Sequence, residues 1–442
     1  MGRIQLRDYQ KPAVESLVDN DSHALFSDVG SGKTVMVLEA LDRLDDLGRV
    51  FIVAPLRVMY NVWPKEIEKF TDFSYTIAHG SVSERDKAIS SQSDIVLINP
   101  EGLTWLFENW DLPENSHLII DESHKFKSPS SKRFKLLKQN LSQFKRRWIM
   151  TATPATRNCL DLWSQLFIVD KGETLGKNIT YFRNKYAYKG GYLGREWRPR
   201  SDANQNITQA TKKIVHRVEV QIEDNTLHDF IYVDMPPDAK SIYKKAERQL
   251  AIEVENEPDK ITEAAISAYS LSRQIANGSF YSELKNVIRV HNAKAEATRE
   301  LFDSIQGNSL LVFFLFKHDK ISLLEKFPSA EVIDGTTPAK NTPEIIKRFS
   351  LGLSNVILCH PQSAGTGLDG LQTNCSNICW YGLPDDLGLF LQGNGRIAGH
   401  RANGRLTTIS RIIAKGTIDE VISDRLDHKD IDQKSILNHY RR

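Results

Sequence analysis

Short apolar runs, many of them rich in β-branched residues, recur along the first third of the chain, and each is followed by a polar stretch and a longer helical pattern. The runs occupy residues 24–26, 50–54, 94–98, 117–120 and 147–150. Continuous apolar runs of this length are typical of strands buried on both faces of a parallel sheet. The pattern up to residue 155 therefore predicts a doubly wound α/β domain, whose ligand sites lie at the carboxyl ends of the strands.

The alternation stops after residue 155 and returns near residue 291. In the interval, 177–200 contains several glycines and is expected to be a loop, whereas 239–251 and 261–275 have helical spacing. Further apolar runs follow at 310–314, 332–334, 356–358, 377–381 and 411–414. The chain is therefore predicted to contain two α/β halves with a helical insert between them.

Composition and charge narrow the possible classes of function. The 442 residues are 40% hydrophobic and 26% charged, which excludes wholesale disorder. Because 58 basic residues against 56 acidic ones give a net charge of only +2, any site for a polyanion must come from local clustering. The four cysteines fit neither a disulfide framework nor a zinc ligand set, which indicates thiols in a reducing compartment. We see no secretory signal and no apolar stretch long enough to span a bilayer, so we expect a soluble intracellular protein without a membrane partner.

The strongest local signal is the glycine-rich segment Asp28–Thr34, which follows a predicted strand and opens a helical pattern. Glycines let backbone N–H groups curl around a phosphate chain, and the helix N-terminus adds its positive end. Lys33 would reach the β- and γ-phosphates of ATP, and the Thr34 hydroxyl would hold Mg²⁺. The strict pattern has a glycine where this chain has Ser27, and a chance glycine-rich turn is the alternative interpretation. Three neighbouring residues would cradle the phosphates: Gly30, Ser31 and Gly32.

Two adjacent carboxylates follow the predicted strand 117–120. In a nucleotide site, Asp121 would orient Mg²⁺ and Glu122 would polarise the attacking water. His124 is expected to bridge neighbouring motifs rather than to bind a metal. An exposed acidic loop end is the alternative, and the phosphate loop earlier in the chain disfavours it.

Taken in order with Thr151–Pro154, the GSGKT and DESH segments resemble the motifs of superfamily 2 helicases, specifically of their Swi/Snf-like branch. The resemblance implies an α/β fold of two RecA-like parallel-sheet lobes, 1–170 for ATP binding and 291–442 as the helicase C-terminal lobe. It places a basic and aromatic loop and a mainly helical insertion at 171–290, and it implies ATP and Mg²⁺ as cofactors. Short segments in the order of the family carry the resemblance: Leu6–Gln10, Ala54–Leu56, Asn99–Glu101, Asp121–Lys125, Thr151–Asn158, Phe230–Met235, Leu271–Asn277, Val312–Phe314, Ile333–Thr337 and Ser363–Asp369.

The resemblance also assigns roles to single residues. Gln10, with Arg7 beside it, corresponds to the glutamine that reads the adenine edge. Gly367 and Asp369 belong to a motif that senses the nucleotide. Trp63 lies in a stretch that contacts a DNA strand in the family. The other positions expected to contact a strand are Pro55, Arg57, Asn99, Ser363, Ala364 and Gly365.

The last motif departs from the family. In the family, a glutamine is followed by an arginine four residues on and by a second arginine three residues further. The second arginine acts as an arginine finger. Gln392 and Arg396 keep the first spacing, but Gly399 occupies the third position and Arg401 follows two residues later. Since only the guanidinium fork stabilises the transferring phosphoryl group in this way, either Arg401 acts from a lengthened loop or Arg396 carries the role alone.

Basic residues cluster in two stretches. Nine lie between Asp121 and Met150, and 177–200 contains seven, with one acidic residue and six interleaved aromatic residues. Basic groups pair with phosphates, and aromatic rings stack on exposed bases or wedge a junction. A solvated basic face with aromatic rings packed on the lobe is the alternative. We expect DNA contacts from Lys125, Lys127, Arg183, Lys185, Lys189, Arg195 and Trp197.

Together these features predict an ATP-dependent DNA helicase or translocase that remodels forks or Holliday junctions by branch migration in repair, recombination or replication. The expected partner is duplex, forked or four-way-junction DNA. We expect a monomer that works in the cytoplasm, at the nucleoid, of a bacterial or phage-infected cell. Two alternatives stay open: a DNA-binding clamp or scaffold with a vestigial ATPase, and a nucleotide-dependent subunit of a restriction or defence complex.

Overall fold

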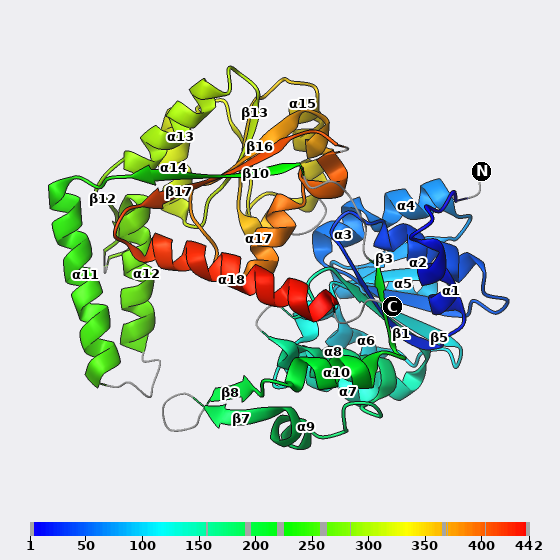
Figure 1. The fold of residues 1–442 in the computed structure, drawn as a ribbon. Coiled ribbons are helices and arrows are strands. Elements are labelled where there is room, and N and C mark those ends of the chain that lie inside the picture. Colours follow the sequence, from blue (N-terminus) through cyan, green and yellow to red (C-terminus); the bar gives the residue numbers. More distant parts are fainter. Residues whose placement is uncertain are drawn as a thin grey trace. The chain divides into compact units, whose positions relative to one another are not determined.

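The computed structural model describes residues 4–155, 158–190, 196–218, 225–256, 263–282, 284–364, 368, 370–402 and 404–438. The chain divides into two units, the first containing the described residues up to 218 together with 430–438, and the second those of 225–429 (Figure 1). Each unit contains a large parallel sheet with helices on both faces, which confirms the predicted α/β class. Within these ranges, no helix is both long and apolar enough to cross a membrane.

The first unit is built on a seven-stranded sheet of order β3-β4-β2-β5-β6-β1-β9, in which all neighbours are parallel. All five apolar runs predicted in this half form strands. β3 and β9 were not predicted, because they are short and only partly buried. The strands are β1 (Ser22–Ser27), β2 (Arg49–Val53), β3 (Tyr75–Ala78), β4 (Ile95–Ile98), β5 (Ser116–Asp121), β6 (Phe144–Thr151) and β9 (Val215–Val218).

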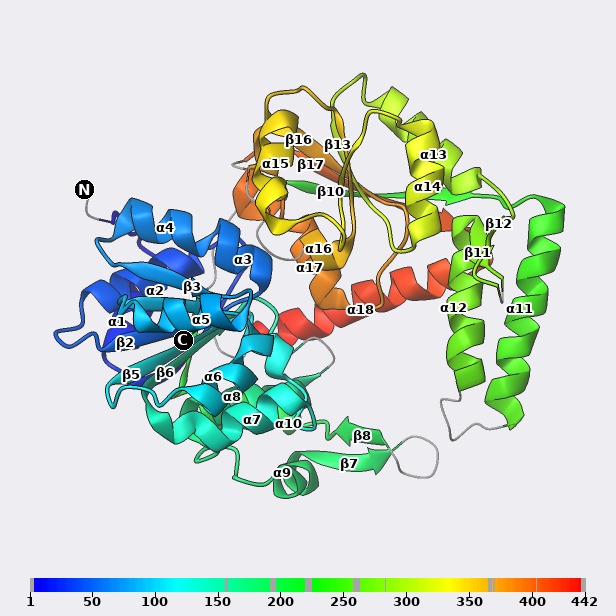
Figure 2. The same ribbon diagram turned by 180° about the vertical axis from the view of Figure 1, so that it is seen from behind.

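Helices cover both faces of this sheet (Figure 2). One face packs against α1 (Lys11–Val18), α2 (Lys33–Asp42), α3 (Leu56–Asn61) and α4 (Trp63–Phe70). The other face packs against α5 (Val82–Ser90), α6 (Leu103–Asn109), α7 (Lys132–Asn140), α8 (Leu162–Asp170) and α10 (Ala203–Thr211). Short 3₁₀ turns connect them: η1 (Pro100–Gly102), η2 (Ser123–Phe126), η3 (Leu141–Gln143) and η4 (Cys159–Asp161).

The described residues of 177–200 form a helix and two strands, so the prediction of a loop was wrong for them. Helix α9 (Ile179–Tyr186) leads into an antiparallel hairpin of β7 (Ala187–Gly190) and β8 (Glu196–Pro199). The rings of Phe182 and Tyr186 are buried in the core of the first unit, with centroids 5.1 Å apart. They anchor the hairpin and are not available to stack on bases. Two apolar residues four positions apart make only one helical turn, which is too short a signal to stand out in the sequence.

The second unit contains a six-stranded parallel sheet of order β10-β17-β16-β13-β15-β14. The five strands predicted here are confirmed. The sixth strand, β10, is a half-exposed edge strand without a continuous apolar run. The strands are β10 (Thr226–Val233), β13 (Ser309–Phe313), β14 (Glu331–Ile333), β15 (Val356–Cys359), β16 (Cys375–Trp380) and β17 (Thr407–Ala414). The helices and turns are α13 (Ala293–Ser304), α14 (Lys317–Lys326), α15 (Thr342–Ser350), α16 (Pro361–Ala364), α17 (Leu387–Asn394), α18 (Ile418–Asn438), η6 (Ala339–Asn341), η7 (Leu371–Thr373) and η8 (Gly399–Ala402).

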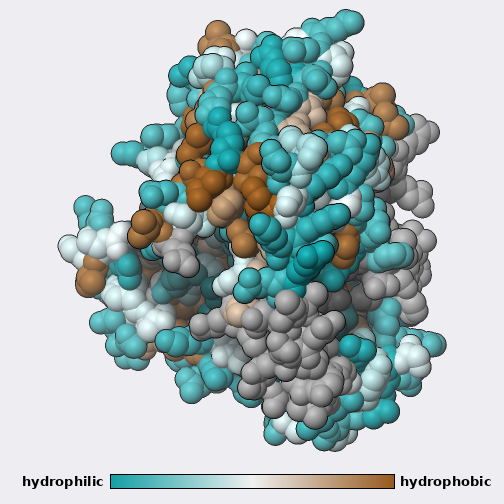
Figure 3. Space-filling model, turned by 90° about the vertical axis from the view of Figure 1, so that its left-hand side faces the viewer, coloured by the Kyte–Doolittle hydropathy of each residue, from teal (hydrophilic) through white to brown (hydrophobic). Residues whose placement is uncertain are grey.

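The two helices predicted from the spacing of 239–251 and 261–275 are confirmed as α11 (Pro237–Asn256) and α12 (Glu263–Asn277) of the second unit, and they pack side by side. The small hairpin of β11 (Ser279–Tyr281) and β12 (Val287–Arg289) follows them. Apolar side chains gather on the side of the molecule where this pair lies (Figure 3). Exposed apolar residues of these elements are Ile242, Ile266, Leu284, Val287 and Ile288.

The expected insertion 171–290 is divided between the two units. Its strand β9 belongs to the first sheet and its strand β10 to the second. Much of this stretch therefore completes the two large sheets, and α9, the β7–β8 hairpin and the α11–α12 pair are added to them.

All four cysteines are free and buried, as expected for thiols of a protein core. Burial raises the pKa of Cys375 and of Cys379 to about 12. At neutral pH these two thiols are protonated and unreactive.

Candidate nucleotide and nucleic-acid sites

The sheet order of the first unit brings three distant segments to one edge. Strands β5, β6 and β1 are consecutive neighbours, and all three run in the same direction. Their carboxyl ends carry Asp121, Thr151 and the loop after Ser27, respectively. The phosphate loop, the acidic pair and the Thr151 segment therefore meet at the edge where parallel α/β sheets bind ligands.

The loop between β1 and α2 has the backbone of a phosphate cradle. Gly30 (φ 80°) and Gly32 (φ 84°) both have the left-handed backbone that favours glycine. A Cβ atom on Gly32 would lie 2.5 Å from Nε2 of Gln10, so the loop has no room for a side chain at this position. Lys33 and Thr34 then open α2.

Lys33 is folded back onto the loop. Its Nζ donates to the carbonyl oxygens of Ser27 and Asp28, both at 3.2 Å. Burial lowers the pKa of Lys33, while the charges of Glu122, Asp121 and Asp28 oppose that shift. The ammonium group is thus surrounded by the acidic groups of the site, as a group that binds phosphate beside a metal would be.

Gln10 joins the start of the chain to this loop. Its Oε1 accepts from the backbone N–H of Arg7 at 2.9 Å, and its Nε2 donates to the carbonyl of Ser31 at 2.9 Å. Tyr9 reaches the same carbonyl from its hydroxyl at 3.3 Å. The Arg7 side chain is exposed, with Nη1 3.4 Å from the Tyr9 hydroxyl. Gln10 and Arg7 therefore stand beside the phosphate loop, and adenine recognition by them remains a prediction.

The acidic pair has two different environments. Asp121 is buried, and its Oδ2 accepts from Nε1 of Trp63 at 3.1 Å. Burial, together with the neighbouring charge of Glu122, raises the pKa of Asp121 to about 7. Burial acts in the same direction on Glu122, but the hydrogen bond and charge of His124, together with the charges of Lys33 and Lys125, outweigh it and hold the pKa of Glu122 at about 2.

Glu122, His124 and Thr151 form one polar cluster. His124 Nδ1 lies 3.2 Å from Glu122 Oε2 and 3.1 Å from Thr151 Oγ1, which confirms that His124 bridges motifs. Thr151 Oγ1 lies 3.3 Å from Glu122 Oε2 and accepts from the backbone N–H of Thr153 at 3.1 Å. Glu122 has a left-handed backbone (φ 59°), which is uncommon outside glycine and strains the turn that holds this carboxylate.

Trp63 is the residue whose place differs most from its expected one. The family resemblance put it in a stretch that contacts DNA, but its ring is fully buried and its N–H is committed to Asp121. No local signal indicates this, because Trp63 and Asp121 are 58 positions apart. Only the sheet order shows that they meet.

These residues fit a nucleoside triphosphate with Mg²⁺. The left-handed glycines leave a backbone cradle, and Lys33, Thr34 and Asp121 follow the strands that end beside it. No cluster of three or more His, Cys, Asp or Glu side chains that could hold a metal occurs among the described residues. The Thr34 hydroxyl and the Asp121 carboxylate suit Mg²⁺, which keeps several waters and is bound by one or two protein groups together with phosphate oxygens.

The strand-contacting residues predicted in the first unit have mixed exposure. Pro55 is buried at the start of α3, and Arg57 is half-buried on that helix. Asn99 is buried and donates to Oε2 of Glu101 at 2.9 Å. The two basic residues of this group are more accessible: Lys125 is exposed and Lys127 is half-buried.

The basic residues of α9 and the hairpin lie close to aromatic rings of the same element. The guanidinium of Arg183 lies 5.7 Å and the ammonium of Lys189 5.9 Å from the ring centroid of Trp197. Lys185 stands over the ring of Tyr186 at 4.9 Å. Arg195 lies outside the described residues. The structure therefore brings four of the five predicted residues into one basic and aromatic element.

In the second unit, the residues of the last motif lie on and after α17. Gln392 is buried, and its Nε2 has no hydrogen-bond partner among the described residues. Arg396 is buried just beyond the helix. Arg401 lies on η8 and donates from Nη1 to the carbonyl of Leu368 at 3.1 Å. Ser363 and Ala364 lie on α16, whereas Gly365, Gly367 and Asp369 lie outside the described residues.

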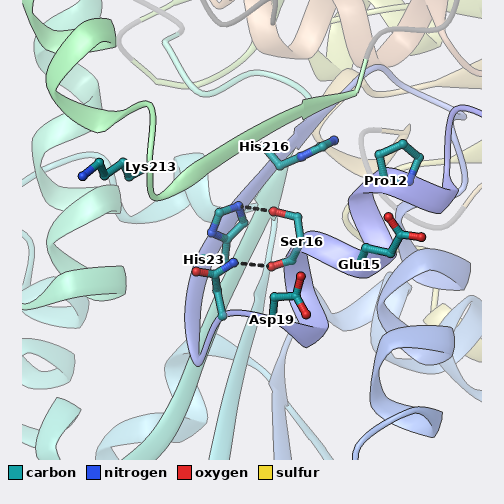
Figure 4. Close-up of a pocket in the computed structure, with 8 residues that line it drawn as sticks. Pro12, Glu15, Ser16, Asp19, His23, Lys213 and His216 are labelled. Atoms are coloured by element: carbon teal, nitrogen blue, oxygen red, sulfur yellow. Dashed lines mark hydrogen bonds between the residues drawn. The ribbon is translucent and has the colours of Figure 1, made fainter.

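A cavity of about 300 Å³ opens at the other end of β1, away from the phosphate loop. Helix α1 contributes Pro12, Glu15 and Ser16 to its wall, and Ser16 Oγ lies 2.9 Å from Nε2 of His23 (Figure 4). None of the site residues predicted from the sequence lines it.

Comparisons with known proteins agree with the motif pattern. The signature of the SNF2-related domain matches residues 9–281. Protein p41 of Acyrthosiphon pisum secondary endosymbiont phage 1 is 27% identical, over 99% of this chain and 98% of the phage protein. The DNA annealing helicase and endonuclease ZRANB3 of Bos taurus is 24% identical, over 99% of this chain but 41% of its own length. Nuclear protein STH1/NPS1 of Saccharomyces cerevisiae is 23% identical, over 98% of this chain and 35% of its own length.

Among solved structures, the SWI2/SNF2 ATPase core of Sulfolobus solfataricus in complex with dsDNA aligns with a TM-score of 0.45 and 20% identity. The alignment covers 98% of this chain and 94% of that one. The domain signature, by contrast, spans more than half of the 442 residues. The chain therefore belongs to the SNF2-related family of ATPase and helicase-type domains.

Proposed function

We propose that this protein is an ATP-dependent DNA translocase that moves along DNA and remodels forks or four-way junctions by branch migration, in repair, recombination or replication. The observation that carries the proposal is the meeting of the phosphate loop, the acidic pair and Thr151 at one sheet edge in a member of the SNF2-related family. Similarity to a protein named as a DNA annealing helicase supports DNA as the substrate. The whole-length similarity to a phage protein supports work in the cytoplasm of a bacterial or phage-infected cell.

Each residue of the first unit has a task in this proposal. Lys33 and the backbone of the phosphate loop bind the β- and γ-phosphates, and Thr34 and Asp121 hold Mg²⁺. When bound, Mg²⁺ supplies charge neutralisation at the transferring phosphoryl group. Because its pKa is about 2, Glu122 is ionised at neutral pH and accepts a hydrogen bond from the attacking water. His124 and Thr151 link that carboxylate to the segment after β6, which would couple hydrolysis to motion.

The second unit would complete the site with Gln392 and an arginine finger, either Arg396 or Arg401. Closure of two lobes around a nucleotide assembles such a site only when both halves meet. DNA that favours the closed state should therefore raise the rate of ATP hydrolysis.

The β7–β8 hairpin is the part of the proposal that concerns forks and junctions. Its two faces differ, because the register pairs Lys189 with Trp197 on one face and Tyr188 with Arg198 on the other. The first face is occupied by the cations that stand over Trp197. Tyr188 is 48% exposed. A Cβ atom on Gly190 would lie 3.1 Å from the Tyr188 ring and 2.8 Å from Arg198 Cδ, so both side chains lie over this glycine.

We propose that Tyr188 stacks on a base and that Trp197, which was expected from the sequence to contact DNA, supports the hairpin instead. Stacking on an aromatic side chain is worth about 1–3 kcal/mol per base, or roughly 5- to 150-fold in affinity. Tyr188→Leu should therefore weaken binding of a fork with an unpaired arm, and Tyr188→Phe should not. Quenching of a 2-aminopurine base next to the fork measures this directly, and an equal response of the two variants would refute the role of Tyr188.

The proposed function is tested by steady-state ATP hydrolysis without nucleic acid and with single-stranded, duplex, forked and four-way-junction DNA. Lys33→Ala serves as the blank. Stimulation that is greatest with forks or junctions supports branch migration. Rates equal to the blank on every DNA, with DNA binding retained, would leave a clamp with a vestigial ATPase. Co-purification with a stoichiometric nuclease would favour the subunit of a defence complex.

A further inference from the structure

An ion pair that no sequence motif predicted stands at the phosphate loop. Arg217 is the third residue of β9 and lies opposite Phe26 of β1. Its Nη2 is 2.5 Å from Oδ1 of Asp28, the residue with which the loop begins. The two residues are 189 positions apart in the chain and are joined because β9 pairs with the strand that carries the loop.

The guanidinium is buried and incompletely paired. The Arg217 side chain is 5% exposed, and its Nε and Nη1 have no hydrogen-bond partner among the described residues. A buried charge with unused donors is unfavourable in itself. A side chain retained in this state therefore has a use that packing alone does not supply.

The charges around the loop indicate that use. Asp28, Asp121 and Glu122 are acidic, and a triphosphate adds more negative charge at the same sheet edge. Burial is the main cause that lowers the pKa of Lys33, and the positive charge of Arg217 acts in the same direction, so the two cations are within electrostatic range of each other. Without Arg217, the Asp28 carboxylate would lose one of the positive charges beside it, and its repulsion of a polyphosphate would rise.

We propose that Arg217 is a positioning residue of the nucleotide site, which fixes the first turn of the phosphate loop through Asp28 and cancels a carboxylate charge that would otherwise repel a nucleoside triphosphate. The inference rests on the proposed function for the identity of the ligand. It adds a residue that lies outside the motifs identified in the sequence and acts from the neighbouring strand.

The test is a double-mutant cycle read by nucleotide binding, with fluorescent analogues of ATP and ADP and with adenosine as competitor. Arg217→Met should weaken ATP binding by about tenfold or more, ADP binding by less and adenosine binding not at all, because the repulsion grows with the charge of the ligand. Asp28→Asn in the Arg217→Met background should restore ATP affinity to within about threefold of wild type. Arg217→Lys keeps the charge and should retain most of the affinity.

Several outcomes would overturn the proposal. Equal losses for ATP, ADP and adenosine would show that Arg217→Met merely disturbs the fold. Failure of Asp28→Asn to restore affinity would show that the charge of Asp28 is not the reason. If Arg217→Met does not fold, Arg217→Gln, which also removes the charge, takes its place in the same comparison. A wild-type protein that does not bind ATP would refute the proposed function, whereas wild-type affinity in Arg217→Met refutes only this inference.

Discussion

His117 provides a sharp test of the electrostatics of the first unit. It lies on β5, is 1% exposed, and neither ring nitrogen has a hydrogen-bond partner among the described residues. Burial lowers its pKa to about 4 from an ordinary value of 6.5, and the neighbouring charges of Arg146 and Lys145 add to the shift. The charges of Asp46 and Asp21 oppose it but do not cancel it. His117 is therefore neutral in the folded protein at any pH near neutrality.

The sign of the pH dependence follows from this pKa. Between pH 6.5 and pH 4 the unfolded chain binds the proton and the folded protein does not, so protonation favours unfolding. The stability of the first unit should fall as the pH drops through this window. Linkage gives a loss of about 2 kcal/mol at pH 5 and about 3 kcal/mol below pH 4.

The assay measures urea unfolding of wild type and of His117→Leu at pH 7.5 and at pH 5, with tryptophan fluorescence as the signal. Six of the seven tryptophans belong to the first unit, so the signal reports on the unit that contains His117. Between the two pH values, the free energy of unfolding of wild type should fall by about 2 kcal/mol more than that of the variant. The other titrating groups are common to both proteins. A parallel loss in the two proteins would refute the reasoning.

Other substitutions test the site itself. Trp63→Phe removes the donor to the buried Asp121 and should raise the Mg²⁺ concentration for half-maximal ATP hydrolysis by about tenfold, measured by Mg²⁺ titration. Arg401→Ala should lower kcat by at least about a hundredfold if Arg401 is the finger, and an unchanged kcat would assign that role to the earlier arginine of the motif. Gly32→Ala should abolish nucleotide binding, because φ is 84° there and the added Cβ has no room. Its control is Gly416→Ala in the second unit, where φ is also positive (66°) but a Cβ atom would meet nothing within 4 Å, and loss of binding in both variants would contradict the cradle.

Much of the fold could be predicted where a strand is buried on both faces. The run 117–120 is apolar after His117, and it forms the central strand that ends at the acidic pair. β10 was not predicted as a strand because it is an edge strand, with residues such as Phe230 and Tyr232 exposed. β9 was not predicted because it is short and contains His216 and Arg217 among its four residues. Periodicity detects the burial of a strand, and edge strands are only partly buried.

The residues of the candidate site also fall into those that could be predicted from the sequence and those that could not. Gly30, Gly32 and Lys33 could be predicted because their chemistry depends on neighbours along the chain. Trp63 and Arg217 could not, because each reaches the site from a different element and is identified only by the order of the strands. Sequence reasoning finds residues that act within one loop, and misses those that act from another element.

The position of β9 has a consequence for how the chain can be divided. β1, which leads into the phosphate loop, is an interior strand only because β9 covers its free side. A fragment that ended near residue 170 would keep every motif of the nucleotide site in this unit and yet leave unpaired the backbone N–H and C=O groups on the side of β1 that faces away from β6. Exposed strands of this kind pair with other chains and aggregate. A soluble, separate first unit should therefore need the chain to continue through Val218.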